Sequence, residues 1–235
     1  MIKAVFFDLD GTLLPMDQDV FTKAYFSLLA KKIVPVRGYD MQQFIKSIWY
    51  RLGAMQANDG SKTNEEAWWQ AYCSVFGTQA REDEGMFYDF YVNEFQQVAA
   101  ACGRNEKADA AVKAVKARGL KAVLATNPVF PQVATASRMK WAGLDEKDFE
   151  LFTTYEDYSW CKPNFEYYQR ILDKTGLKAE ECAMIGNDVG EDMVAEKMGM
   201  KVFLLTDDLI NKSEADINQW PHGGFDRMID FINNL

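Results

Sequence analysis

Apolar side chains recur at helical spacing between residues 16 and 103. Three stripes share this spacing and are formed by Phe44, Ile48 and Leu52, by Trp68, Tyr72 and Phe76, and by Phe87, Tyr91 and Phe95. With the segment around residues 20–33, they predict about four helices. Aromatic stripes can line a ligand site, but at this spacing they more often form a core. We therefore expect a helical bundle over residues 16–103.

Polar and small residues mark where these helices begin and end. Thr63 followed by Glu66 forms a capping box, which predicts a helix start at this point. Gly77 and Gly103 are expected helix ends, because glycine readily adopts the conformation that closes a helix. Pro15 breaks the chain before the bundle.

After residue 104 the pattern changes to alternating strands and helices. Strands are predicted over residues 120–125, 151–153, 182–185 and 201–205, and helices over residues 106–118, 131–142, 165–175, 191–198 and 225–234. Such alternation is typical of a Rossmann-like parallel sheet with helices on both faces. The apolar run at residues 2–8 would be unpaired alone, so we assign it to this sheet. The expected fold is α/β, with a core domain of residues 1–15 and 104–235 and an inserted helical domain of residues 16–103.

Composition and charge narrow the class of partner. The chain has 235 residues, of which 48% are hydrophobic and 26% charged, which is ordinary for a globular protein. Its formal charge of -9 argues against nucleic acid or an anionic membrane as a partner, since both attract clustered lysine and arginine. No segment approaches the roughly 20 apolar residues that cross a membrane. We expect a monomer or a homodimer.

The cysteines indicate the compartment. All four are scattered, and the chain has one histidine, His222, so neither a zinc site nor a disulfide framework is expected. Reduced cysteines favour a cytoplasmic protein. The apolar run at the N-terminus is too short for a signal peptide and leads directly to Asp8.

The most informative motif is Asp8-Leu9-Asp10-Gly11-Thr12, which follows the first apolar run. Asp8 and Asp10 point to the same side of an extended chain, and Gly11 allows a sharp turn. Crowded carboxylates repel each other unless a cation or a shared proton lies between them. A few carboxylates together with a substrate phosphate form a donor set typical of Mg²⁺. An ordinary acidic turn after a strand is the alternative interpretation.

Two later loops carry suitable chemistry, because ligands of parallel sheets bind beyond the carboxyl ends of the strands, and a Lys-Pro pair that means little by itself lies between them. Thr126-Asn127-Pro128 offers a hydroxyl and backbone N–H groups before a helix, as a phosphate site requires. Residues 186–192 form an acidic turn after another strand, and Lys162 precedes Pro163. Each has an ordinary interpretation, namely turn residues, acids at a helix start, or a solvated lysine.

Taken in order, these four segments resemble the four motifs of the haloacid dehalogenase superfamily, most of whose members are Mg²⁺-dependent phosphatases. The helical insert resembles the cap that closes over the site in that superfamily. The resemblance implies that Asp8 is the nucleophile and a metal ligand. It implies that Asp10 is the general acid/base, with its backbone carbonyl on the metal.

The same resemblance implies roles for the later segments. Thr126 and the Asn127 backbone would bind phosphate, and Lys162 would balance charge. Asp188 would complete the metal ligands, with Asp192 as a further ligand or an orienting residue. The fourth motif has Gly-Asn-Asp where many relatives have Gly-Asp.

The expected activity is Mg²⁺-dependent hydrolysis of a small phosphomonoester through an aspartyl-phosphate. Dehalogenating relatives lack the second aspartate, so Asp10 indicates phosphate chemistry. A phosphomutase or phosphotransferase with the same motifs stays open, because only the acceptor of the phosphoryl group differs. A binding protein on a retired scaffold should have lost an essential carboxylate or Lys162, and neither is lost.

Polar residues of the predicted cap are candidates for touching the substrate. They are Arg51, Lys46 and the loop over residues 58–62. Each fits an ordinary surface position better than a binding role, and so does His222.

Overall fold

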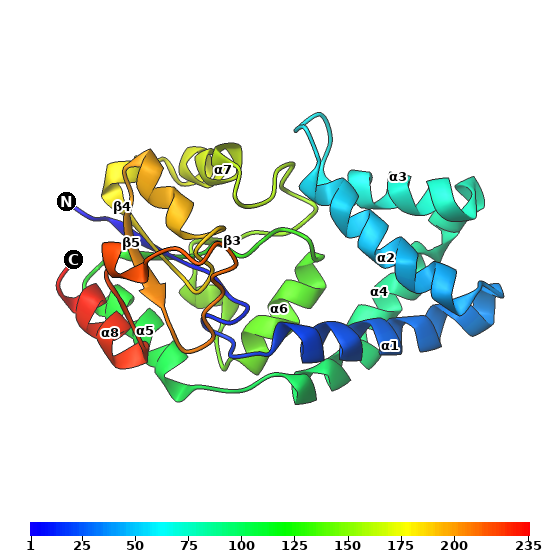
Figure 1. The fold of residues 1–235 in the computed structure, drawn as a ribbon, viewed down its shortest axis with the longest axis horizontal. Helices are drawn as coiled ribbons and strands as arrows, with labels where there is room; N and C mark the ends of the chain where they lie inside the picture. Colours follow the sequence, from blue (N-terminus) through cyan, green and yellow to red (C-terminus); the bar gives the residue numbers. More distant parts are fainter.

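The computed structural model describes residues 1–235 and contains one parallel sheet of six strands (Figure 1). The strands are β1 (Ala4–Phe7), β2 (Lys121–Leu124), β3 (Leu151–Phe152), β4 (Cys182–Gly186), β5 (Lys201–Leu205) and β6 (His222–Gly223). Their spatial order is β3-β2-β1-β4-β5-β6, and every neighbouring pair is parallel. The predicted α/β class and the place of the first strand in the sheet are confirmed. Strand β6 was missed, because two residues are too few for a periodic signal.

Helices cover both faces of the sheet, as predicted. Alternate residues of β1 divide between the faces, so Val5 and Phe7 belong to one hydrophobic cluster and Ala4 and Phe6 to the other. The first cluster takes in α5 (Glu106–Ala117), α6 (Gln132–Trp141) and α8 (Phe225–Asn233). The second takes in α7 (Phe165–Thr175) and the short 3₁₀ helix η5 (Met193–Met198), which stands where a helix over residues 191–198 was expected.

Four α-helices extend away from the sheet, at the right in Figure 1. They are α1 (Gln18–Arg37), α2 (Met41–Gln56), α3 (Asn64–Phe76) and α4 (Glu84–Val92), joined to 3₁₀ helices η1 (Thr78–Asp83) and η2 (Glu94–Ala101). The predicted capping box at the start of α3 is present, and Gly77 follows its last residue. The third aromatic stripe is divided between α4 and η2, because the α-helix ends at Val92 and Asn93 is its C-cap.

The chain passes between the sheet and the helices at two adjacent points. The N–H of Gly103 donates to the carbonyl of Pro15 at 2.7 Å, and Met16 bridges Cys102. One hydrophobic cluster runs from the sheet face under α5 and α8 into the helical region. Both chain termini lie at the end of the molecule away from these helices (Figure 1). No helix is long and apolar enough to traverse a lipid bilayer. All four cysteines are free thiols.

Candidate active site

The first motif continues β1, and its loop turns at Gly11. The N–H of Asp8 donates to the carbonyl of Ile185 at 2.9 Å, so pairing with β4 extends to this residue. Leu9 is fully buried, which leaves Asp8 and Asp10 on the other side of the chain. Gly11 has a φ of 79°, and a Cβ there would lie 2.3 Å from the side chain of Asn187. Only glycine therefore fits at this position.

Lys162 reaches the candidate nucleophile from the loop before α7. Its Nζ donates to Oδ1 of Asp8 at 2.8 Å and to Oδ1 of Asp192 at 2.6 Å. The side chain is 1% exposed, so the interpretation as a solvated lysine is wrong. Burial lowers the pKa of Lys162, but the carboxylates of Asp192 and Asp8 outweigh it and raise the pKa well above its ordinary value. The ammonium group therefore stays charged beside Asp8.

The second motif forms a loop beside Lys162. Thr126 is buried, and its carbonyl accepts hydrogen bonds from Thr153 at 2.5 Å and Tyr167 at 2.8 Å. The side chain of Asn127 accepts the N–H of Lys162 at 3.3 Å, which ties the loop to the third motif. The Thr126 hydroxyl and the Asn127 backbone N–H form no hydrogen bond within the protein. Both donors are therefore free, and their binding of phosphate oxygens stays a prediction.

The fourth motif supplies two carboxylates with different surroundings. Asp188 folds back on its own turn, and its Oδ1 accepts the N–H groups of Gly190 and Glu191 at 2.7 and 3.0 Å. Asp192 is 1% exposed, and its Oδ2 accepts the N–H of Asp188 at 3.0 Å. Burial raises the pKa of Asp192 to about 6. Lys162 donates to the other oxygen, so both oxygens of Asp192 accept hydrogen bonds within the protein, and the side chain orients the lysine.

Arg138 is a site residue that the sequence analysis missed. It comes from α6, is fully buried, and forms an ion pair with Oδ2 of Asp10. It also donates to Oγ1 of Thr135 at 3.2 Å and lies 4.2 Å from the ring centre of Phe130. Burial raises the pKa of Asp10 above its ordinary value, although Arg138 opposes the shift. Neither spacing nor periodicity links residues 128 positions apart, so no sequence signal indicated this pair.

Asn187 and Glu191 also escaped the sequence analysis as site residues. Asn187 accepts a hydrogen bond from Oγ1 of Thr12 at 2.9 Å and donates to the carbonyl of Asp208 at 2.6 Å. Glu191 accepts from Nδ2 of Asn127 at 3.0 Å. Burial raises the pKa of Glu191 to about 7. The turn after β4 thus connects the first and second motifs. The strand-loop-helix pattern of this segment was the one sequence signal that could have indicated Asn187 and Glu191.

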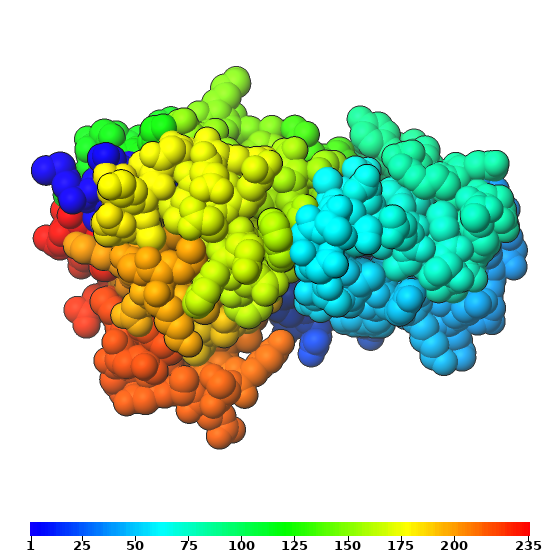
Figure 2. Space-filling model, turned by 90° about the horizontal axis from the view of Figure 1, so that it is seen from above, coloured from blue at the N-terminus to red at the C-terminus, as the bar shows by residue number.

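The predicted cap meets the motif loops at the start of α3. The buried Nδ2 of Asn64 donates to the carbonyl of Pro128 at 3.0 Å and contacts Sγ of Cys161 at 3.4 Å. A Cβ on Gly60 would lie 2.0 Å from the ring of Trp160, so the loop before α3 packs closely on the core. Figure 2 shows this cap segment, in cyan, against the yellow-green segment around residue 160. The contacts bind the cap to residues adjacent to the second and third motifs.

The cap candidates from the sequence have different outcomes. Lys46 is exposed, as expected, and His222 is half-buried in β6, where its Nδ1 lies 2.9 Å from the carbonyl of Trp220. The surface position expected for Arg51 is wrong, because its side chain is fully buried among aromatic rings.

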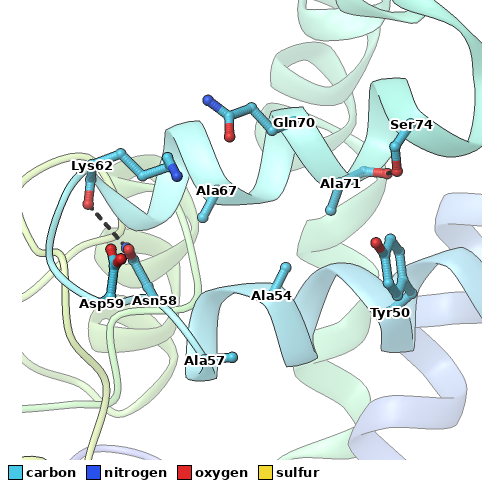
Figure 3. Close-up of a pocket in the computed structure, with 10 residues that line it drawn as sticks. All are labelled: Tyr50, Ala54, Ala57, Asn58, Asp59, Lys62, Ala67, Gln70, Ala71 and Ser74. Carbon is cyan, nitrogen blue, oxygen red and sulfur yellow. Dashed lines mark hydrogen bonds between the residues drawn. The ribbon is translucent and has the colours of Figure 1, made fainter.

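The loop over residues 58–62 lies at one end of a pocket of about 350 Å³ between α2 and α3 (Figure 3). Nδ2 of Asn58 donates to the carbonyl of Lys62 at 2.9 Å and closes the loop. The other wall residues include Tyr50, Gln70 and Ser74. The loop therefore borders a groove of the cap itself.

The predicted set of four metal ligands is only partly compatible with the geometry. No group of three or more His, Cys, Asp or Glu side chains is arranged to hold a metal ion. Arg138 is paired with Oδ2 of Asp10, and the two oxygens of Asp192 accept from Lys162 and from the N–H of Asp188. Oδ2 of Asp8 accepts only from Oγ1 of Thr12, at 3.4 Å, so Asp10 and Asp192 are the less available side chains. The carboxylates of Asp8 and Asp188 and the Asp10 carbonyl, which accepts no hydrogen bond, remain. This all-oxygen set fits Mg²⁺, which usually takes one or two carboxylates, water and substrate phosphate.

Comparison with known proteins places this chain in a family. The chain is 25% identical over 216 residues to "Putative phosphatase YhcW" of Bacillus subtilis, covering 87% of this chain and 84% of that protein. Its fold is similar to a HAD phosphatase from Thermococcus onnurineus, with a TM-score of 0.61, 16% identity and 99% and 97% of the two chains covered. YfnB of Bacillus subtilis, solved bound to magnesium, has a TM-score of 0.55 at 14% identity, with 99% of each chain covered. A family model of haloacid dehalogenase-like hydrolases matches residues 2–199, and the chain belongs to this family.

Proposed function

We propose that this hydrolase cleaves a small phosphomonoester through an aspartyl-phosphate on Asp8. The observation that carries the proposal is the contact of Asp8 with buried Lys162, while Asp10 stands two residues away on the same side of the chain. A carboxylate attacks a phosphate dianion only when positive charge offsets their repulsion. Lys162 supplies part of that charge inside the site.

Two half-reactions share these residues. An Asp8 oxygen attacks phosphorus, the ester P–O bond breaks, and Asp10 gives its proton to the leaving oxygen. Asp10 then takes a proton from the water that attacks the phosphorus of the aspartyl-phosphate, which frees Asp8 and phosphate. Because Arg138 holds Oδ2 of Asp10, the unpartnered Oδ1 is the atom that carries the proton.

The remaining groups hold the phosphate and a cation. The Thr126 hydroxyl and the Asn127 N–H donate to phosphate oxygens. Asp8, the Asp10 carbonyl and Asp188 would hold Mg²⁺, which would supply the remaining neutralising charge. Magnesium binding by YfnB supports this choice. Residues 16–103 act as a lid over the core formed by residues 1–15 and 104–235.

The test is release of inorganic phosphate from 4-nitrophenyl phosphate with and without Mg²⁺. We expect turnover with Mg²⁺ and loss of turnover in excess chelator. In Asp10→Asn, a good aryl leaving group still departs while water attack slows, so mass spectrometry should detect phosphoryl-Asp8. Full turnover in chelator would overturn the metal assignment. Transfer of the phosphoryl group to a second substrate hydroxyl, with no free phosphate, would instead identify a mutase.

A further inference from the structure

Arg51 is a buried cation in the middle of the cap. It lies on α2, its side chain is fully buried, and its Nε donates to the carbonyl of Ser47 at 3.0 Å. Neither Nη1 nor Nη2 has a hydrogen-bond partner, and the residue takes part in no ion pair. Burial lowers the pKa of Arg51 to about 10, so the group still carries its charge at neutral pH.

Aromatic rings surround the guanidinium but do not satisfy it. Its Cζ lies 4.4 Å from the ring centre of Trp68, 4.6 Å from Tyr72, and 5.5 and 5.6 Å from Phe44 and Phe87. Such rings attract a cation through their faces. They do not replace oxygen acceptors for the N–H groups, which point outward in the guanidinium plane. The donors on Nη1 and Nη2 therefore lack acceptors in the cap.

The surrounding charges leave Arg51 without a counter-ion. The buried acid Asp83 is already paired with Arg37 and accepts the hydroxyl of Tyr72 at 2.7 Å. Toward the core lies the hydroxyl pair of Tyr25 and Tyr91, 2.7 Å apart, and the charge of Arg51 acts on both.

A second buried arginine, Arg138, lies over the ring of Phe130, which packs against Tyr25. Arg138 also acts on Tyr25, and its own charge is matched by Asp10. Contacts run from Asp10 to Arg138, from Arg138 to the ring of Phe130, and from Phe130 to Tyr25, whose ring centre lies 5.4 Å from that of Phe130. Together with Arg51, this series contains two positive charges and one negative charge. The unmatched positive charge lies on the cap side.

We propose that Arg51 binds an anionic group of the substrate that is remote from the phosphate being cleaved. The fork of Nη1 and Nη2 donors matches two oxygens of one carboxylate or of a second phosphate. The inference rests on the proposed phosphatase activity and specifies its substrate class as a phosphomonoester with a second oxyanion. Entry requires the cap helices to separate, because Arg51 has no exposed surface in this closed arrangement.

A purely structural role for Arg51 makes the opposite prediction. A buried charge without a partner costs stability, and an apolar residue of similar volume is often neutral or stabilising in its place. Arginine is therefore a poor choice for a residue whose role at this position is only to fill the core of the cap. If Arg51 binds substrate, Arg51→Met should unfold at or above the wild-type temperature while selectivity is lost.

The experiment compares kcat/KM for glycerol 1-phosphate, 3-phosphoglycerate and 1,3-propanediol bisphosphate, which differ in the second anion. We expect wild-type protein to prefer one anionic probe over glycerol 1-phosphate by roughly ten- to a hundredfold, the effect of a charge-assisted contact. Arg51→Met should abolish that ratio, and Arg51→Lys should reduce it, because lysine keeps the charge but loses the fork. Lys46→Met, at an exposed position of the same helix, should keep the wild-type ratio.

A binding measurement separates this inference from the proposed activity. In Asp8→Asn, the preferred probe should change the emission of Trp68, which contacts the guanidinium, and Arg51→Met in the same background should remove the change. Equal kcat/KM for all three probes, or a ratio unchanged in Arg51→Met, would overturn the inference while aryl phosphate turnover upholds the phosphatase. No phosphate release from any probe would overturn the phosphatase, and the emission change would then still test the anion site.

Discussion

Replacing Lys162 by methionine should remove both stability and activity, because it leaves two carboxylates without their shared cation. The Nζ lies 2.8 Å from Asp8 and 2.6 Å from Asp192, and the side chains of Lys162 and Asp192 are each 1% exposed. Breaking a buried charge pair by removing one partner costs about 3–5 kcal/mol. For a chain of this size that corresponds to a fall of about 6–20 °C in Tm. Loss of a charge-stabilising group in the site should lower kcat/KM roughly a hundredfold or more.

Thermal unfolding in chelator, together with phosphate release in Mg²⁺, measures the two effects separately. Asp192→Asn combined with Lys162→Met provides the control, since it removes one of the carboxylates left unpaired. The double variant should be less destabilised than the sum of the two single variants by about 1–3 kcal/mol, because the groups are in contact. It should remain inactive, because Asp8 still lacks its lysine. A Tm for Lys162→Met within about 1 °C of wild type, or additive single effects, would refute the reasoning.

Three further variants test other parts of the site. Asp8→Asn should have a Tm at or above that of the wild type, because a carboxylate is removed from a crowded acidic site. Its turnover should fall below about a hundredth of the wild-type rate, and a higher rate would contradict a covalent intermediate. Glu191→Gln should remove a pH dependence of the free energy of unfolding. The pKa of Glu191 is raised to about 7 in the folded protein, so this residue stabilises the fold most below about pH 4.5. Between pH 4.5 and 7 the wild type should therefore lose up to about 3 kcal/mol of stability relative to the variant. Unfolding in chelator that is parallel for both proteins across this range would show that Glu191 does not titrate there. Asn64→Ala should cost about 1–3 kcal/mol and raise KM, because the cap loses its bonds to Pro128 and Cys161; unchanged Tm and KM would mean that these contacts do not hold the cap.

The sequence by itself determined the order of the longer strands and helices and located the four motif loops. Periods of two and of about 3.6 residues are local properties, so the strands at residues 182–185 and 201–205 and the capping box at Thr63 could be predicted from neighbours along the chain. Motif chemistry is also local, because Asp8 and Asp10 lie on one side of a single extended segment. The parallel sheet then follows from the alternation of strands and helices, which allows few topologies.

Only the tertiary structure decided how distant polar groups are paired. Arginine is usually a surface residue, yet packing buries both Arg51 and Arg138. Their spacing in the sequence carries no information about which acid or aromatic ring each one contacts. The same limit applies to Asp192, which the sequence allows as a metal ligand or as an orienting residue. Its contacts with Lys162 and a backbone N–H, which favour the orienting role, come from the fold. Burial raises the energetic cost of every unpaired charge. The fold brings together partners that the local sequence pattern does not encode. These partners therefore determine which carboxylates can bind a cation and which are paired with other side chains of the protein.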